Sequence, residues 1–180
     1  MSDRLPLEAL VVDDEAEIRE LLVEFLRSKG LPVASACDGR AAVTALQREP
    51  SRYNFVITDL ALPGVDGLGV LRAAREANPS CQVVIVTGYA SLDSAIQAVR
   101  LGAYDYLTKP FSLGQIDVIL ARLRYRLNLE AENRQLLHRL ELEIHLRVIL
   151  VGAAQFIRNC FHASLHQHLH HHRSARAGQP

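Results

Sequence analysis

Strand-like and helix-like segments alternate strictly along roughly the first 120 residues of this 180-residue chain. Short apolar runs typical of buried strands are each followed by a segment whose apolar residues have helical spacing. The strand-like runs cover residues 7–12, 32–37, 54–58, 81–87 and 103–108, and the helix-like segments begin near residues 13, 39, 67, 91 and 112. Parallel neighbouring strands need crossover connections, which place helices on both faces of the sheet. The sequence therefore predicts an α/β fold with a doubly wound five-stranded parallel sheet.

The first helix-like segment, residues 13–30, shows the helical pattern most clearly. Its apolar residues recur at i, i+3, i+4, i+7 and i+8 and form one stripe along a helix: Ile18, Leu21, Leu22, Phe25 and Leu26. Gly30 follows the stripe, as glycine often does after the last residue of a helix. We expect this stripe to be the face that packs on the sheet.

Polar side chains stand at the carboxyl ends of four of the strand-like runs. They are Asp13, Asp14 and Glu15 after the first run, Asp59 after the third, Thr87 at the end of the fourth, and Lys109 with Pro110 after the fifth. Each has an ordinary structural explanation, since acids cap helices and form turns, threonine suits strands and lysine is usually solvated. In doubly wound folds, however, ligands bind beyond the carboxyl ends of the strands. We therefore expect these groups to converge on one edge of the sheet.

Three carboxylates at one edge repel one another unless a cation lies among them. All-oxygen ligands of this kind suit Mg²⁺, which takes one or two carboxylates and keeps several waters. With the repulsion neutralised, Asp59 can remain ionised and attack phosphorus to form an acyl phosphate. Lys109 and the hydroxyl of Thr87 are placed to hold the phosphoryl oxygens. The pattern predicts that Asp59 is phosphorylated.

Four motifs, in order along the chain, resemble the receiver domain of two-component response regulators. They are VVDDE at 11–15, ITDLALPGVDGL at 57–68, VIVTGYAS at 84–91 and AYDYLTKPF at 103–111. The resemblance covers residues 5–125 and is strongest to the receivers of nitrogen-regulation-type regulators, which lead into an AAA+ ATPase. It implies a flavodoxin-like fold and a phosphoaccepting response regulator that takes its phosphoryl group from a sensor histidine kinase.

The resemblance also implies roles for the acidic residues. Asp59 resembles the phosphoacceptor. Asp14 and Asp59 resemble direct Mg²⁺ ligands, Asp13 acts mainly through water, and Ala61 lends its backbone carbonyl. A protein of this kind is no enzyme toward other molecules, because it assists only its own phosphorylation and dephosphorylation.

Three further residues resemble the parts of the family's conformational switch. Lys109 resembles the phosphate-binding lysine, and the Lys109–Pro110 bond is expected to be cis. Thr87 and Tyr106 resemble the switch pair, in which the hydroxyl swings toward the phosphoryl group and the aromatic ring turns inward. Signalling would then run through the face around the fourth helix.

Two enzyme classes with this fold fit the sequence less well. A haloacid-type phosphatase would need Asp-x-Asp at its nucleophile, and Ala61 stands at the second of those positions. A flavin-binding electron carrier would need a phosphate-binding loop after the first strand, where this chain has carboxylates that repel phosphate. Both classes are disfavoured.

Residues 126–147 read as a helical linker that continues the fifth helix. Its apolar residues slip between helical registers: Leu127, Leu129, Leu136, Leu137, Leu140 and Ile144. A short coiled coil is one option, and a helix folded back on its own receiver is the other. A homodimer could form through this linker or through the face of the fourth helix and fifth strand.

Residues 148–180 resemble no effector domain. No lysine follows Lys109, which excludes a Lys-Ser/Thr phosphate-binding loop there, and no helix-turn-helix for DNA is evident. The segment FHASLHQHLHHHR at 161–173 predicts a disordered, His-rich end or a metal-binding tract. An alternative is that the chain is the receiver and linker of a truncated or frameshifted transcription regulator. Without a signal peptide or an apolar run long enough to span a membrane, a cytoplasmic location is expected.

Overall fold

The computed structural model describes residues 7–176, with side chains described for residues 7–145. The strands are β1 (Ala9–Val12), β2 (Val33–Ala36), β3 (Phe55–Asp59), β4 (Gln82–Thr87) and β5 (Asp105–Thr108). The helices are α1 (Ala16–Ser28), α2 (Gly39–Arg48), α3 (Gly67–Ala77), α4 (Leu92–Arg100) and α5 (Leu113–Arg176). All four strand pairs are parallel, in the order β2-β1-β3-β4-β5, which confirms the predicted doubly wound, flavodoxin-like fold.

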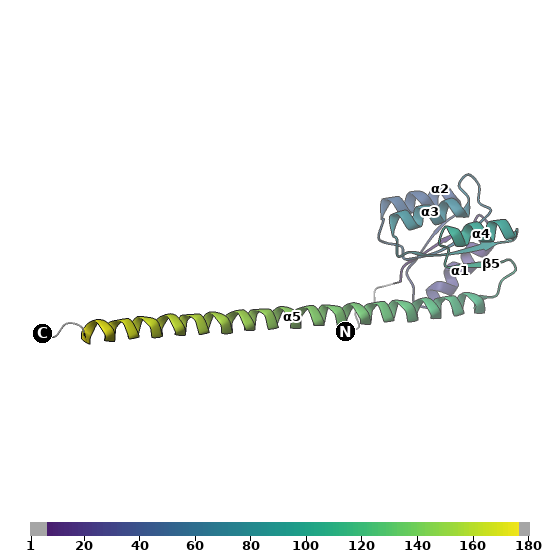
Figure 1. Ribbon diagram of the computed structural model, residues 1–180. Coiled ribbons are helices and arrows are strands. Elements are labelled where there is room, and N and C mark those ends of the chain that lie inside the picture. The colour runs from purple at the N-terminus through teal and green to yellow at the C-terminus, as the bar shows by residue number, and fades with distance from the viewer. Residues whose placement is uncertain (1–6, 177–180) are drawn as a thin grey trace. The chain divides into compact units, whose positions relative to one another are not determined.

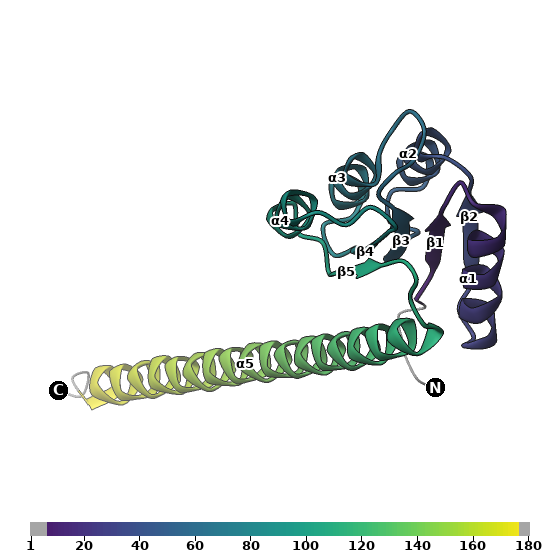
Figure 2. The same ribbon diagram turned by 90° about the vertical axis from the view of Figure 1, so that its right-hand side faces the viewer.

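Helices cover both faces of the sheet (Figure 1, Figure 2). On one face, α2, α3 and α4 pack over apolar side chains that include Leu10, Val56 and Ile85. On the other face, α1 and the first turns of α5 pack over Phe55 and Val84. The central strands β1, β3 and β4 are therefore buried on both sides, as their unbroken apolar runs predict.

The buried face of α1 differs from the predicted stripe. Leu22, Val23 and Leu26 are buried, whereas the Leu21 side chain is 47% exposed. Leu21 precedes Leu22 by one residue and so points about 100° away around the helix. The prediction was wrong for Leu21 and missed Val23. The helix ends as predicted, with Gly30 at a positive φ of 80°.

The third strand lies one residue further along the chain than predicted, at 55–59 in place of 54–58. Asp59 is the last residue of β3, where the prediction placed it just beyond the strand. Its partner in the ladder is Val86 of β4, so the Asp59 backbone is held by the sheet itself. The turn that follows returns closely to this strand. A Cβ built on Gly67, the first residue of α3, would lie 2.2 Å from the carbonyl oxygen of Asp59.

The chain divides into two units, residues 1–127 and 128–180, and α5 runs through the division. The structure differs from the predicted disordered end, because α5 continues to Arg176. No proline occurs between Pro110 and Pro180 to stop the helix. The predicted role of the His-rich segment 161–173 concerns side chains outside the described residues. Within the described part of the chain, no helix is long and apolar enough to cross a membrane.

Candidate functional site

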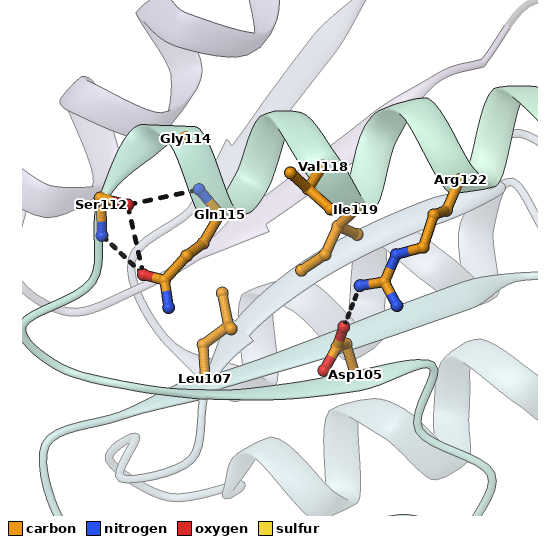
Figure 3. Close-up of a pocket in the computed structure, with 8 residues that line it drawn as sticks. All are labelled: Asp105, Leu107, Ser112, Gly114, Gln115, Val118, Ile119 and Arg122. Carbon is orange, nitrogen blue, oxygen red and sulfur yellow. Dashed lines mark hydrogen bonds and ion pairs between the residues drawn. The ribbon is translucent and has the colours of Figure 1, made fainter.

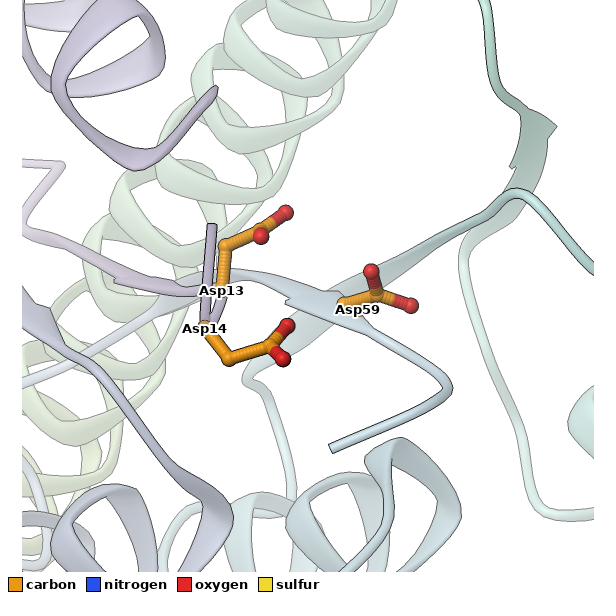
Figure 4. Close-up of side chains that lie close together, drawn as sticks. All are labelled: Asp13, Asp14 and Asp59. Carbon is orange, nitrogen blue, oxygen red and sulfur yellow. The ribbon is translucent and has the colours of Figure 1, made fainter. Parts of the chain in front are cut away.

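The three aspartates predicted at the sheet edge lie together in the structure (Figure 4). Asp13 and Asp14 directly follow β1, and Asp59 ends the adjacent parallel strand β3. One carboxylate oxygen from each lies within 4.8 Å of the others. Asp13 and Asp59 are buried, whereas Asp14 is exposed. Of the three acids, Asp14 is therefore the one that is exposed to solvent.

Lys109 lies among these acids and contacts three carboxylates. Its Nζ is 2.6 Å from Oδ2 of Asp59, 3.0 Å from Oδ2 of Asp13 and 2.8 Å from Oε1 of Glu15. An ammonium group has three hydrogens to donate, so these partners take them all. The Lys109–Pro110 bond is cis, as the resemblance implied. The sequence placed Lys109 correctly at this edge but assigned Glu15 no role.

Burial and pairing oppose each other in this cluster. Burial raises the pKa of Asp13 above its ordinary value, although the hydrogen bond and positive charge of Lys109 lower it in part. Burial by itself lowers the pKa of Lys109, but the hydrogen bonds to Asp59, Glu15 and Asp13 raise it above its ordinary value. Lys109 is therefore a permanent cation at neutral pH.

Backbone donors orient the two buried carboxylates. Oδ1 of Asp59 accepts the N–H of Ala61 at 2.9 Å, and Oδ1 of Asp13 accepts the N–H of Glu15 at 2.9 Å. Arg19, from the first turns of α1, donates to the carbonyl oxygen of Asp13 at 2.7 Å. Because each buried acid has one oxygen held by its own loop, the second oxygen is directed toward Lys109 and the cluster.

The two residues of the predicted switch lie on the neighbouring strands β4 and β5. Thr87 ends β4 and is fully buried, and its Oγ1 accepts the N–H of Tyr89 at 3.0 Å. The carbonyl oxygen of Thr87 accepts the N–H of Lys109 at 2.7 Å, which ties β4 to the loop after β5. Tyr106 on β5 is half-buried, and its hydroxyl lies 2.9 Å from Oγ of Ser94 in α4. Ser94 was not predicted from the sequence.

The donor set of the cluster fits a hard divalent cation. All three side-chain donors that converge are carboxylate oxygens, and one of the three residues is accessible to solvent. Two of the three acids also share a single ammonium, so the group with Lys109 retains net negative charge. Among the described residues, no buried side-chain nitrogen or oxygen lacks a hydrogen-bond partner.

The chain is similar to known proteins over this domain. Residues 9–121 match the family of response regulator receiver domains. The response regulator protein PilR of Pseudomonas aeruginosa is 41% identical over 133 residues, which cover 73% of this chain and 29% of PilR. The chain spans between 27% and 50% of the length of PilR and other curated relatives.

Two solved structures show the same fold. A response regulator receiver domain protein from Clostridium thermocellum is 29% identical with a TM-score of 0.63, and the match covers 68% of this chain and 98% of that one. A response regulator protein from Burkholderia pseudomallei, solved with a phosphorylated aspartic acid, calcium ion and citrate, is 28% identical with a TM-score of 0.59. That match covers 69% of this chain and 72% of the other. This chain belongs to the response regulator receiver domain family of two-component systems.

Proposed function

We propose that Asp59 is the phosphoacceptor, charged from the phosphohistidine of a sensor histidine kinase. The observation that carries this proposal is the carboxylate of Asp59 itself. It is buried at the end of β3, one of its oxygens is held by the Ala61 amide, and the other lies 2.6 Å from Lys109. A nucleophile held in one orientation beside a fixed cation suits attack on phosphorus. The Burkholderia relative with its phosphorylated aspartic acid supports the same reaction.

The reaction exchanges one bond to phosphorus for another. An oxygen of Asp59 forms the new O–P bond while the N–P bond of the phosphohistidine breaks, and its electron pair returns to the imidazole nitrogen. Lys109 would donate to a phosphoryl oxygen after giving up one of its carboxylate partners, and the hydroxyl of Thr87 would supply a second donor after leaving the Tyr89 amide. Such donors stabilise the charge on the transferred group.

We assign the divalent site to Asp13, Asp14 and Asp59, with the backbone carbonyl of Ala61, and propose Mg²⁺ as its ion. When bound, Mg²⁺ would neutralise the acids and polarise a phosphoryl oxygen. The three carboxylates whose oxygens lie within 4.8 Å support this assignment. The domain acts on no other molecule in this proposal, because the group it accepts stays on its own side chain until it is hydrolysed.

The phosphoryl group would signal by changing the conformation around Thr87, Tyr106 and α4. Such a switch shifts the populations of two pre-existing states. In the simplest form of the proposal, the changed face signals by binding another protein. The alternative is that this receiver and linker serve a longer transcription regulator, and it is favoured by the greater length of PilR. Free Cys37 and Cys81 suit a reducing compartment, which supports a cytoplasmic location.

A homodimer through the part of α5 beyond residue 127 is a further element of the proposal. Leu136, Leu140 and Ile144 are each more than half exposed on this helix. Exposed leucines at helical spacing are a common basis of coiled coils. Replacing Leu136 and Leu140 by Asp should reduce the size of the particle in sedimentation. If the variant and the wild type sediment equally, the homodimer through α5 is refuted.

The decisive experiment is Mg²⁺-dependent labelling by a small phosphodonor, read by intact mass. The wild type should gain one phosphoryl group, and the isosteric variant Asp59→Asn should gain none. Asp66→Asn is a matched control, because Asp66 is an exposed acid that caps α3 outside the cluster. A mass gain that persists in Asp59→Asn would overturn the assignment of the acceptor.

A further inference from the structure

The hydroxyl of Tyr106 has a specific partner at the start of the neighbouring helix. It lies 2.9 Å from Oγ of Ser94, which is in the first turn of α4. Figure 2 shows α4 beside β5, the strand that carries Tyr106. The half-buried ring therefore spans from the sheet to the helix and is tied there by one side-chain hydrogen bond.

Ser94 is also part of the cap of α4. Its Oγ accepts the N–H of Ser91 at 3.2 Å, and its own N–H donates to Oγ of Ser91 at 3.1 Å, which forms a capping box. Oγ of Ser94 also donates to the carbonyl oxygen of Ser91 at 3.0 Å. Oγ of Ser94 also accepts the O–H of Ser91 at 2.9 Å. A hydroxyl donates once and accepts twice, so Ser94 has more partners than it can serve at one time, and its bond with Tyr106 competes with the contacts of the cap. The same oxygen thus serves both the helix cap and the tyrosine.

The segment that leads into α4 also holds the other switch residue. Oγ1 of Thr87 accepts the N–H of Tyr89, two residues further along the same segment. Residues 87–94 therefore hold the hydroxyl of Thr87 at one end and the hydroxyl of Tyr106 at the other. A movement of the first turn of α4 changes the Tyr106 contact directly, and it reaches the Thr87 contact through the residues between Tyr89 and the helix.

We infer that Ser94 is a positioning residue that holds Tyr106 against α4 in the unphosphorylated protein. Rotation of the ring then requires this hydrogen bond to break, so the ring and the first turn of α4 move together. The inference deepens the proposed function, on which it rests for the consequence of the movement. Loss of one neutral hydrogen bond shifts such an equilibrium about fivefold, the equivalent of about 1 kcal/mol.

The first test observes the ring directly in the unphosphorylated protein. Fluorotyrosine labelling gives each of the five tyrosines a ¹⁹F signal, and the Tyr106 signal is assigned by its loss in Tyr106→Phe. Ser94→Ala should shift the Tyr106 signal toward a second environment, whereas Ser94→Thr, which keeps the hydroxyl, should leave it near the wild-type position. An unchanged Tyr106 signal in Ser94→Ala would overturn the inference. This measurement needs no phosphoryl group, so it is independent of whether Asp59 is the acceptor.

The second test separates the hydrogen bond from the helix cap by a double-mutant cycle. The rate of Asp59 labelling by a small phosphodonor should rise about fivefold in Ser94→Ala and in Tyr106→Phe. The double variant should gain no more than either single variant, because both remove the same bond. Ser91→Ala is the matched control, since it removes the cap contacts that the Ser91 hydroxyl makes with Ser94 but keeps both hydroxyls of the Ser94–Tyr106 bond. An equal gain in Ser91→Ala, or additive gains in the double variant, would overturn the inference.

The cavity between β5 and α5 carries no comparable inference. It has a volume of about 410 Å³ and an apolar floor that includes Leu107 and Ile119. The Asp105–Arg122 ion pair lies at one end and the Ser112–Gln115 contact at the other (Figure 3). Each of these polar groups already has its partner within the cavity wall, and nothing in the structure shows what would cover it.

Discussion

A methyl group added at Gly67 should damage both the fold and the position of Asp59, the proposed phosphoacceptor. The Cβ of Gly67→Ala would lie 2.2 Å from the carbonyl oxygen of Asp59 and 2.8 Å from Cα of Leu60. Both are backbone atoms, so no side chain can rotate out of the way. To restore an ordinary contact, the chain must retreat by about 1.2 Å, the difference between 2.2 Å and 3.4 Å. This movement pulls against the hydrogen bond from the N–H of Gly67 to the carbonyl oxygen of Leu60.

The expected loss of stability follows from these contacts. Overpacking costs about 1–3 kcal/mol, and contact with backbone favours the upper part of that range. Alanine gains up to about 1 kcal/mol over glycine in a helix, which offsets part of the cost. The net loss is about 2 kcal/mol, which at a urea m-value of about 1.5 kcal/mol/M lowers the unfolding midpoint by about 1.3 M. Because a displacement of about 1 Å can cost about 100-fold in rate, labelling of Asp59 should slow by a similar factor.

The matched control is Gly114→Ala in the first turn of α5. Its nearest neighbour outside the adjacent residues is Oγ of Ser112 at 3.7 Å, an ordinary contact. This variant should be more stable than the wild type by about 0.4–1 kcal/mol, because the unfolded chain loses freedom. If Gly67→Ala has the same unfolding midpoint and labelling rate as the wild type, the close approach of the two backbones is refuted.

Three further predictions concern the charges and the turn around Asp59. Lys109→Met leaves the buried carboxylates of Asp13 and Asp59 without their cation, so the metal-free protein should lose about 3 kcal/mol in urea unfolding; equal midpoints would contradict the ion pairs. Because the pKa of Asp13 is raised in the folded state, its contribution to stability is present below its unfolded pKa and is lost as the pH rises through the folded pKa. When metal-free protein is acidified from pH ~7, the wild type should therefore gain stability relative to Asp13→Asn. A relative loss of wild-type stability would be inconsistent with the burial of Asp13. Ala61 cannot orient a water, so Ala61→Asn should lose phosphate faster than the wild type in a timed mass assay, and identical decay would disprove this.

The sheet edge was predictable from the sequence because strand order and strand ends decide what meets there. Asp13, Asp59, Thr87 and Lys109 each stand at the end of a strand, and a parallel sheet brings such ends together. No detailed side-chain geometry was needed for that prediction. The resemblance to receiver domains then supplied the roles that position alone leaves open.

The details that were missed depend on packing between elements. Whether Leu21 or Val23 faces the core depends on how α1 is rotated against the sheet, which helical spacing alone does not determine. Ser94 carries no signal in the sequence beyond a Ser-x-x-Ser spacing, because its contact with Tyr106 crosses from α4 to β5. The helical continuation beyond residue 148 was missed because a His-rich segment is typical of a disordered end, although no proline there stops a helix.

The saturated ammonium of Lys109 has a consequence for how the site treats anions in solution. All three ammonium hydrogens already have carboxylate partners. To bind Lys109, a free chloride or sulfate ion must displace a carboxylate that belongs to the same chain. Tethering gives each carboxylate a high local concentration, so ordinary buffer anions compete poorly. An anion that is covalently attached to Asp59 is tethered as well, so it can compete with the carboxylates for Lys109. If Asp59 is phosphorylated as proposed, the attached phosphoryl group would therefore replace a carboxylate as a partner of Lys109 more readily than a dissolved salt ion would.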